Sequence, residues 1–226
     1  SELKIIPKNF ALDGKIVREI VELGGVSVVR QGAISVLMIV LNYSLFTYGG
    51  EISISIFGII NRVMMFALSP VLGVSQGFLP VAGFNIGAAK NDRVKETIKK
   101  SIYFGSVLGS IIFIGIIFLK EEIIWIFTND TTLLSQTPNA MIIVFLATPI
   151  VTMQLIGSAY FQAAGKSIPA LFLTLLKQGI FLIPLAYILP KYYGVAGVWW
   201  SFPIADVLST IITIWFLKRE MNKNLQ

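Results

Sequence analysis

Six apolar runs, each long enough to cross a lipid bilayer as a helix, occupy most of the chain. A transmembrane helix needs about 20 predominantly apolar residues, and runs of this length alternate here with short polar stretches. They lie at Val26–Tyr48, Ile52–Leu72, Ser101–Leu119, Ala140–Ala159, Pro169–Leu189 and Val195–Leu217. Glycine and proline within some runs are compatible with helices in lipid, because neighbouring helices satisfy the freed backbone groups. The pattern predicts an all-α fold, a polytopic transmembrane helical bundle of six spans.

The residues before the first run have the pattern of an amphipathic surface helix. Asp13 can cap this helix, and its apolar and charged positions fall on opposite faces. The apolar positions are Ile16, Val17, Ile20 and Val21, and the charged ones are Lys15, Arg18, Glu19 and Glu22. We expect the helix to lie along the cytoplasmic membrane surface and to lead into the first span. The segment does not resemble a signal peptide, because it starts with charged residues and lacks a continuous apolar core.

These patterns divide the chain into three expected parts. Residues 1–25 form a cytoplasmic linker with the amphipathic helix, residues 26–217 a six-span lobe, and residues 218–226 a cytoplasmic tail. The chain starts at Ser1 rather than at a methionine. We read this start either as the continuation of an upstream segment or as a processed end.

The composition supports a membrane protein and argues against an enzyme. Hydrophobic residues make up 55% of the 226 residues and charged residues 13%, whereas soluble globular chains are about 25% charged. Histidine and cysteine are both absent. Their absence removes the usual general base near neutral pH, the commonest metal ligand and any disulfide. We therefore expect no catalytic residue and no metal site.

Basic residues gather on one side of the predicted bundle. Lysine and arginine near span ends are retained on the cytoplasmic side of a membrane. Of the 18 basic residues, only Lys120 and Lys191 fall on the opposite side. Fourteen share the first side: Lys4, Lys8, Lys15, Arg18, Arg30, Lys90, Arg93, Lys95, Lys99, Lys100, Lys166, Lys218, Arg219 and Lys223. This predicts a multi-pass protein of the cell membrane with both ends of the chain in the cytoplasm. The net charge of +6 follows from this topology and needs no nucleic-acid partner.

A group of helix-weakening residues begins late in the second span. Pro70, Gly73, Gly77 and Pro80 recur at nearly regular intervals, with Gln76 among them. Proline removes a backbone donor and glycine lowers helix stability, so we expect this helix to bend near its cytoplasmic end. The alternative is close packing of membrane helices on small residues. Two prolines together with a buried amide favour a functional bend.

The same stretch resembles the multidrug and toxic compound extrusion family of secondary transporters. The resemblance rests on PVLGVSQGFLPVAGFNIG at Pro70–Gly87, followed by Arg93 in a basic loop. Three further stretches are similar to the family, WIFTND, FQAAGKS and GVAGVWWSFPIAD, at Trp125–Asp130, Phe161–Ser167 and Gly194–Asp206. The resemblance implies twelve spans in two six-helix lobes around a central cavity, with this chain as the carboxy-terminal lobe. Its partners would be the amino-terminal lobe of the same transporter and membrane lipid.

The resemblance also implies an activity. Members of this family are antiporters that export drugs and other amphipathic or cationic organic compounds by alternating access, coupled to the entry of sodium ions or protons. Some carry coupling carboxylates on the first and fourth helices of the second lobe. Here Gln31 stands near the first of these positions, and Ala140–Ala159 contains no acidic residue. The resemblance therefore places the coupling ion mainly in the first lobe and implies no other cofactor.

Three charged residues remain inside the predicted spans: Arg62, Lys177 and Asp206. A charge in lipid is costly unless it is paired or faces water. Arg62 either faces the central cavity, where it binds anionic groups, or bonds to helix carbonyls or to Asn61 and Asn42. Lys177 and Asp206 each lie about 17 Å from the connection between the last two spans, and this shared depth predicts that they pair. The alternative is that Asp206 is a proton or sodium site whose affinity Lys177 tunes.

Polar residues along the spans indicate a transport path. We place on it Gln31, Asn42, Arg62, Gln76, Gln154, Lys177 and Asp206. For each amide the alternative is an interhelical hydrogen bond. A broad cationic cavity would fit a flippase for lipid-linked precursors from a related superfamily, and Arg62 with Lys177 keeps this alternative open. A non-transporting membrane scaffold subunit would need no polar path.

Overall fold

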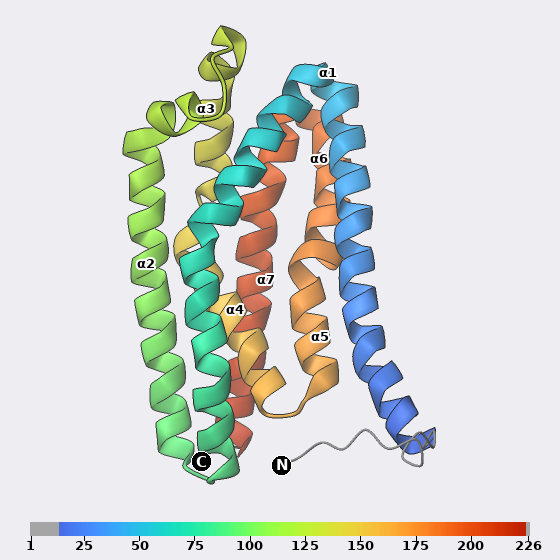
Figure 1. Ribbon diagram of the computed structural model, residues 1–226, viewed down its shortest axis with the longest axis vertical. Helices are drawn as coiled ribbons and strands as arrows, with labels where there is room; N and C mark the ends of the chain where they lie inside the picture. The colour runs from blue at the N-terminus through green and yellow to red at the C-terminus, as the bar shows by residue number, and fades with distance from the viewer. Residues whose placement is uncertain (1–13, 225–226) are drawn as a thin grey trace, which may run out of the picture.

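The computed structural model describes the backbone of residues 14–224 and the side chains of residues 28–223. Every regular element in this part of the chain is a helix, as predicted (Figure 1). The elements are α1 (Gly14–Gly87), α2 (Asn91–Trp125), α3 (Thr131–Phe145), α4 (Thr148–Ala163), α5 (Ser167–Leu175), a π-helical segment (Leu176–Leu182), α6 (Ile183–Tyr193) and α7 (Val195–Asn224).

Helix α1 is a hairpin of two limbs. Gly50 has φ 65° and ψ −164° within an otherwise helical stretch, and the ribbon turns back on itself there (Figure 1). Glycine adopts this positive φ without a steric penalty because it has no Cβ. The two limbs correspond to the predicted spans Val26–Tyr48 and Ile52–Leu72.

The described chain passes through the bundle six times. By length and composition α1, α2, the α5–α6 stretch and α7 can cross a membrane, and α3 with α4 can form a further, bent span. Because α1 doubles back at Gly50, it contributes two passes, which lie beside the others (Figure 1). The predicted all-α membrane bundle is confirmed.

Two passes contain irregularities that the apolar runs did not predict. Helices α3 and α4 meet at an angle of 44°, next to Pro149, which lacks the amide hydrogen that would continue the helix. In the fifth pass the π-helical segment separates α5 from α6, and Pro184 lies two residues beyond its end. The apolar runs therefore place these two spans correctly but do not show their breaks.

The second limb of α1 extends well beyond its predicted end at Leu72, as far as Gly87. Pro70 and Pro80 lie inside this limb, whose backbone angles stay helical. No atom lies within 4 Å of a Cβ built on Gly73 or Gly77, so close packing within this lobe does not account for these glycines. The helix is therefore not interrupted at the expected bend. That this limb bends during transport stays a prediction.

Buried apolar side chains form two clusters that hold the passes together. Leu41, Ile60 and Phe145 belong to the first cluster, which joins both limbs of α1 to α3, α6 and α7. Phe78 and Leu173 belong to the second, which joins the second limb of α1 to α2, α4, α5 and α7. Of the long apolar helices, α7 is the most buried and α2 the least. Helix α2 is therefore the most exposed of these apolar helices.

Helix α2 approaches α4 closely through two glycines spaced four residues apart. A Cβ on Gly109 would lie 2.7 Å from the Thr148 carbonyl oxygen, and one on Gly105 would collide with the Thr152 side chain. Membrane helices commonly pack on small residues in this way, because it brings their backbones together.

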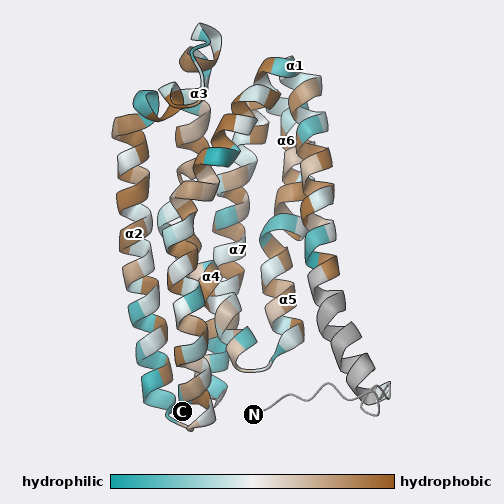
Figure 2. Ribbon diagram, in the orientation of Figure 1, coloured by the Kyte–Doolittle hydropathy of each residue, from teal (hydrophilic) through white to brown (hydrophobic). Residues whose placement is uncertain are grey.

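The basic connections lie together at one end of the bundle. The turn after α1, the α4–α5 connection and the end of α7 all lie at the lower end in Figure 1, where hydrophilic residues gather in Figure 2. These segments carry Lys90, Lys166 and Arg219. The backbone is helical from Gly14 onward, but the predicted linker residues 1–13 and the side chains of the amphipathic helix lie outside the described residues.

Candidate functional site

A polar cavity of about 430 Å³ lies between α1, α4 and the fifth pass. Its polar side chains come from three elements: Arg30, Asn61, Ser75 and Gln76 from α1, Gln154, Ser158 and Gln162 from α4, and Thr174, Lys177 and Gln178 from the fifth pass. Leucine, methionine and phenylalanine side chains form most of the remaining wall, including Met38, Met64 and Phe202. Largely apolar walls with a few polar groups are the usual composition of a small-molecule site.

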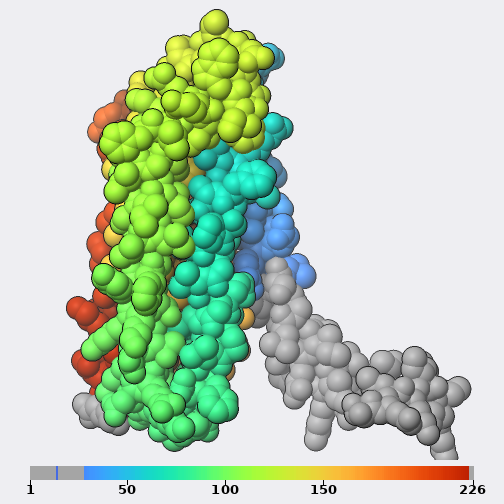
Figure 3. Space-filling model, turned by 60° about the vertical axis from the view of Figure 1, so that its left-hand side comes forward, coloured from blue at the N-terminus to red at the C-terminus, as the bar shows by residue number. Residues whose placement is uncertain are grey.

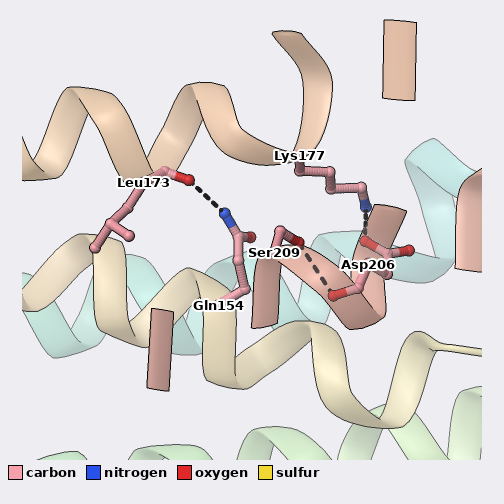
Figure 4. A network of polar contacts seen from close by, with 5 residues as sticks. All are labelled: Gln154, Leu173, Lys177, Asp206 and Ser209. Atoms are coloured by element: carbon pink, nitrogen blue, oxygen red, sulfur yellow. Dashed lines mark hydrogen bonds and ion pairs between the residues drawn. The ribbon is translucent and has the colours of Figure 1, made fainter. Parts of the chain in front are cut away.

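A buried ion pair lies at this cavity. Lys177 Nζ lies 2.5 Å from Asp206 Oδ1, and the contact joins the π-helical segment to α7 (Figure 4). The Asp206 side chain is 8% exposed and that of Lys177 is 21% exposed. Pairing offsets part of the cost of removing both charges from water. The contact that was predicted from the shared depth of the two residues is confirmed.

Hydrogen bonds fix the α4 wall against the fifth pass. Gln154 Nε2 donates to the Leu173 carbonyl at 3.0 Å, as Figure 4 shows. One turn further along α4, Ser158 Oγ lies 2.7 Å from Thr174 Oγ1. Because these bonds join two helices, they hold the Gln154 and Ser158 side chains in fixed positions on the cavity wall.

The π-helical segment supplies adjacent polar residues, Lys177 and Gln178, to the cavity. The wider winding is visible in the bond from the Ile183 amide to the Gln178 carbonyl, five residues earlier. Gly179 lowers helix stability within the segment, and Pro184 lacks an amide hydrogen just beyond it. Wide turns of this kind inside α-helices are frequent at functional sites.

The structure brings together some of the residues predicted for the transport path. Gln76, Gln154 and Lys177 line the cavity, and Asp206 joins them through its ion pair. The other three predicted residues, Gln31, Asn42 and Arg62, do not line this cavity and are exposed on the lobe. Exposed residues of one lobe can face a second lobe, so their place on a transport path stays a prediction.

Arg62 does not form the alternative contacts considered from the sequence. Within the described residues it makes no hydrogen bond to Asn61 or Asn42, and Asn61 rather than Arg62 lines the cavity. Arg62 lies on the exposed side of the second limb, together with Gly73 and Gly77.

Five polar lining residues were missed from the sequence: Arg30, Asn61, Ser75, Ser158 and Thr174. Arg30 was assigned to the cytoplasmic basic group because it lies near the start of the first run. A usable signal existed for α4, where Gln154, Ser158 and Gln162 recur every four residues and must share one helix face.

The cavity offers binding groups. Its amides and hydroxyls can donate and accept hydrogen bonds, and its two basic side chains can bind anionic or polarised groups. No group of three metal-binding side chains is placed together in the described part of the chain. The chemistry that this arrangement supports is recognition of an amphipathic ligand.

Comparison with curated proteins gives relatives that are named as multidrug export proteins. Multidrug export protein MepA of Staphylococcus aureus (strain bovine RF122 / ET3-1) is 25% identical over 173 residues, which cover 76% of this chain and 38% of the relative. Multidrug export protein MepA of Staphylococcus haemolyticus (strain JCSC1435) is 23% identical over 208 residues, or 92% of this chain and 45% of the relative. The chain therefore spans less than half the length of these relatives.

Comparison with solved structures shows the same fold. The inward-facing conformation of a multidrug resistance MATE family transporter of the MOP superfamily matches with a TM-score of 0.88 at 21% identity, over 96% of this chain and 51% of that one. The outward-facing conformation matches with a TM-score of 0.85 at 21% identity, over 97% and 49%. The sequence model of the MatE family matches residues 27–188, which is more than half of the chain. This multi-pass membrane protein therefore belongs to the MatE family, the multidrug and toxic compound extrusion transporters.

Proposed function

We propose that this chain is the carboxy-terminal half of a cation-coupled antiporter that exports amphipathic organic compounds by alternating access. The observation that carries the proposal is the cavity, which combines apolar walls with polar groups held on α4 and on a π-helical segment. The names of the MepA relatives support export of drugs. The similarity of this lobe to both inward-facing and outward-facing transporters supports a lobe that moves as one body. A non-transporting scaffold would have no use for such a cavity.

The partner of this lobe is a second lobe of about the same length. The chain covers about half of the solved transporters that it resembles, and this coverage supports an amino-terminal lobe with six further spans. The exposed side of the second α1 limb carries Arg62, Gly73 and Gln76. An unpaired guanidinium in hydrocarbon is costly, so this side faces the other lobe and the central cavity rather than lipid.

The coupling ion, sodium or a proton, binds mainly in that other lobe. Among the described residues, Asp206 is the one carboxylate in the middle of a pass, and Lys177 pairs with it. A carboxylate that is held by an internal cation is a poor site for an added one. Both ends of the chain lie in the cytoplasm, and the basic end of the bundle faces that compartment.

The test is transport by the full-length parent protein in lipid vesicles. Ethidium efflux is followed under an imposed sodium gradient and, separately, under an imposed proton gradient. We expect one of the two gradients to drive efflux against the ethidium gradient. If neither gradient drives ethidium or any other cationic amphiphile in correctly oriented vesicles, the antiport proposal is wrong.

One observation favours a second candidate, a flippase for lipid-linked precursors. Of the described residues, the two charged ones that line the cavity, Arg30 and Lys177, are both cations, and the one carboxylate next to it, Asp206, is paired with Lys177. Such a lining suits anionic headgroups. In the same vesicles, movement of a fluorescent lipid-linked pyrophosphate between leaflets without ethidium efflux would favour the flippase, and the reverse result would favour the exporter.

A further inference from the structure

A small basic hollow lies between the end of α1 and the start of α2, away from the polar cavity. Asn85, Arg93, Glu96, Thr97 and Lys100 line its volume of about 360 Å³. None of these residues lines the cavity inside the bundle. We propose that this hollow binds the phosphate of an anionic phospholipid headgroup. The inference is independent of the proposed transport activity.

The charge around the hollow favours an anion. Residues 90–100 contain five basic and two acidic residues. Glu96 lies 2.7 Å from Lys100, so the carboxylate in the hollow is already neutralised. Arg93 forms no direct ion pair within the described residues, although it lies near enough to Glu96 to help lower the pKa of that carboxyl. Its planar guanidinium matches the oxygens of a phosphate. The net positive charge favours an anionic lipid over a zwitterionic one.

Hydrogen bonds hold the walls of the hollow and leave donors for a ligand. Thr97 Oγ1 donates to the Arg93 carbonyl at 2.7 Å, and Asn85 Nδ2 donates to the Val81 carbonyl at 2.8 Å. An amide nitrogen carries two hydrogens, so the second hydrogen of Asn85 remains for a phosphate oxygen. Asn85 is 8% exposed, which makes it a fixed donor at the base of the hollow.

An exposed apolar stripe starts one helical turn beyond Lys100 and follows α2 along the bundle. It consists of Phe104, Val107, Ile111, Ile114 and Phe118. Residues spaced by three or four lie on one helix face, so the stripe continues the line of Arg93 and Lys100. Figure 3 shows this side of the molecule, with α2 in green beside the second limb of α1 in cyan. A basic headgroup site next to an exposed apolar stripe fits one phospholipid molecule, with its phosphate in the hollow and an acyl chain along α2.

The experiment measures lipid binding to the protein that contains this chain, at its natural length. The protein is delipidated in detergent and titrated with phosphatidylglycerol or with phosphatidylcholine, and bound lipid is counted by native mass spectrometry. We expect phosphatidylglycerol to bind several-fold more tightly, with an affinity that falls as salt is added. Arg93→Gln should weaken phosphatidylglycerol binding about fivefold, and Arg93→Lys should keep part of the affinity. Lys100→Gln should weaken it more, because it also leaves Glu96 unpaired in the hollow.

The matched control is Lys99→Gln. Lys99 is exposed next to Lys100 but does not line the hollow, so the same change in charge should weaken binding less than about twofold. Equal losses for Lys99→Gln and Arg93→Gln would show diffuse attraction by surface charge and would overturn the site. Equal binding of phosphatidylglycerol and phosphatidylcholine to the wild type would overturn it as well.

Discussion

Lys177 and Asp206 bring opposite charges into contact near the middle of two antiparallel passes. Replacing either by a neutral residue leaves the other charge buried without a partner, and loss of one partner of a buried pair costs about 3 kcal/mol or more. We expect Lys177→Gln and Asp206→Asn each to lower the thermal stability of the full-length protein clearly. The exchanged double variant, Lys177→Asp with Asp206→Lys, should recover much of the loss. Thermal unfolding in detergent measures all three.

The control for this pair is Lys95→Gln. Lys95 lies 4.0 Å from Asp92, whose side chain is fully exposed, and a surface pair of this kind contributes less than about 1 kcal/mol. One outcome would contradict the structural role of the pair. If the exchanged variant is no more stable than the worse single variant, and Asp206→Asn abolishes coupling with the fold intact, Asp206 belongs to the ion path.

The depth of Lys177 and Asp206 in the bundle was predictable from the sequence. The direction in which the polar side chains of the first limb point was not. Lys177 and Asp206 were located by counting outward from one short connection, and helical rise is nearly constant. Gln31 and Asn42 lie in an apolar run without a clear polar face, and their direction depends on how the first limb packs against its neighbours. Arg30 was assigned by its position near a span end, although it reaches the cavity.

Asp130 gives a pH-dependent contribution outside the spans. It caps α3 by accepting hydrogen bonds from the amides of Leu133 and Thr132, and these bonds lower its pKa from the ordinary value of 3.8. Because the folded pKa is lowered, the stabilisation is present at neutral pH and is lost as the pH falls through the lowered value. Asp130→Ala should therefore destabilise the protein at neutral pH. The difference in melting temperature from the wild type should shrink as Asp130 becomes protonated, and a constant difference would contradict the role of the charge.

At the scale of helices, the apolar runs gave the right number and order of passes but not their lengths or breaks. The second limb of α1 continues past its run to Gly87, and α2 begins at Asn91, before its run, because charged residues at a membrane surface end a hydropathy run without ending a helix. At its other end α2 kinks at Leu119, where the run ends. The 44° bend between α3 and α4 lies inside one run, since proline is apolar and does not interrupt it. Pro149 was the signal for this bend.

Contact between α2 and α4 depends on the absence of a side chain at Gly109. A Cβ there would lie 2.7 Å from the Thr148 carbonyl oxygen, so Gly109→Ala must push the helices apart. Overpacking of this kind costs about 1–3 kcal/mol. Gly115→Ala on the same helix is the control, because nothing lies within 4 Å of the added Cβ, and alanine should stabilise that helix position by about 0.5–1 kcal/mol. Opposite shifts in melting temperature are expected, and equal shifts would show that α2 and α4 can separate without cost.

The prolines of the second α1 limb test whether a helix that is unbroken here bends during transport. Each proline removes one backbone hydrogen bond from the limb, so Pro70→Ala with Pro80→Ala should strengthen the helix. We expect the double variant to transport ethidium several-fold more slowly in vesicles while its membrane insertion stays near that of the wild type. Normal transport by the double variant would assign both prolines to packing.

At the scale of the whole molecule, the six passes leave the polar cavity lined by one lobe and the second limb of α1 exposed beside it. Arg62, Gly73 and Gln76 on that side are a poor surface for lipid. We propose that a second lobe covers this surface, and the coverage of about half of the similar transporters supports this. On this proposal the two lobes would share Gln31, Asn42 and Arg62, which the sequence assigned to a path but which do not line this cavity.

The orientation of the bundle can be tested directly, because the chain contains no cysteine. Cysteines are introduced one at a time at exposed positions while every lysine and arginine is kept. Asp92→Cys and Asn222→Cys lie at the basic end of the bundle, and Thr131→Cys and Tyr192→Cys lie at the other end. Since basic residues are retained in the cytoplasm, a membrane-impermeant maleimide added to intact cells should label the second pair. It should label the first pair only after the membrane is permeabilised, and the protein without introduced cysteines gives the background. The reverse pattern would invert the orientation, whereas labelling of one residue from each pair would contradict the six-pass topology, because both members of each pair lie at the same end of the bundle.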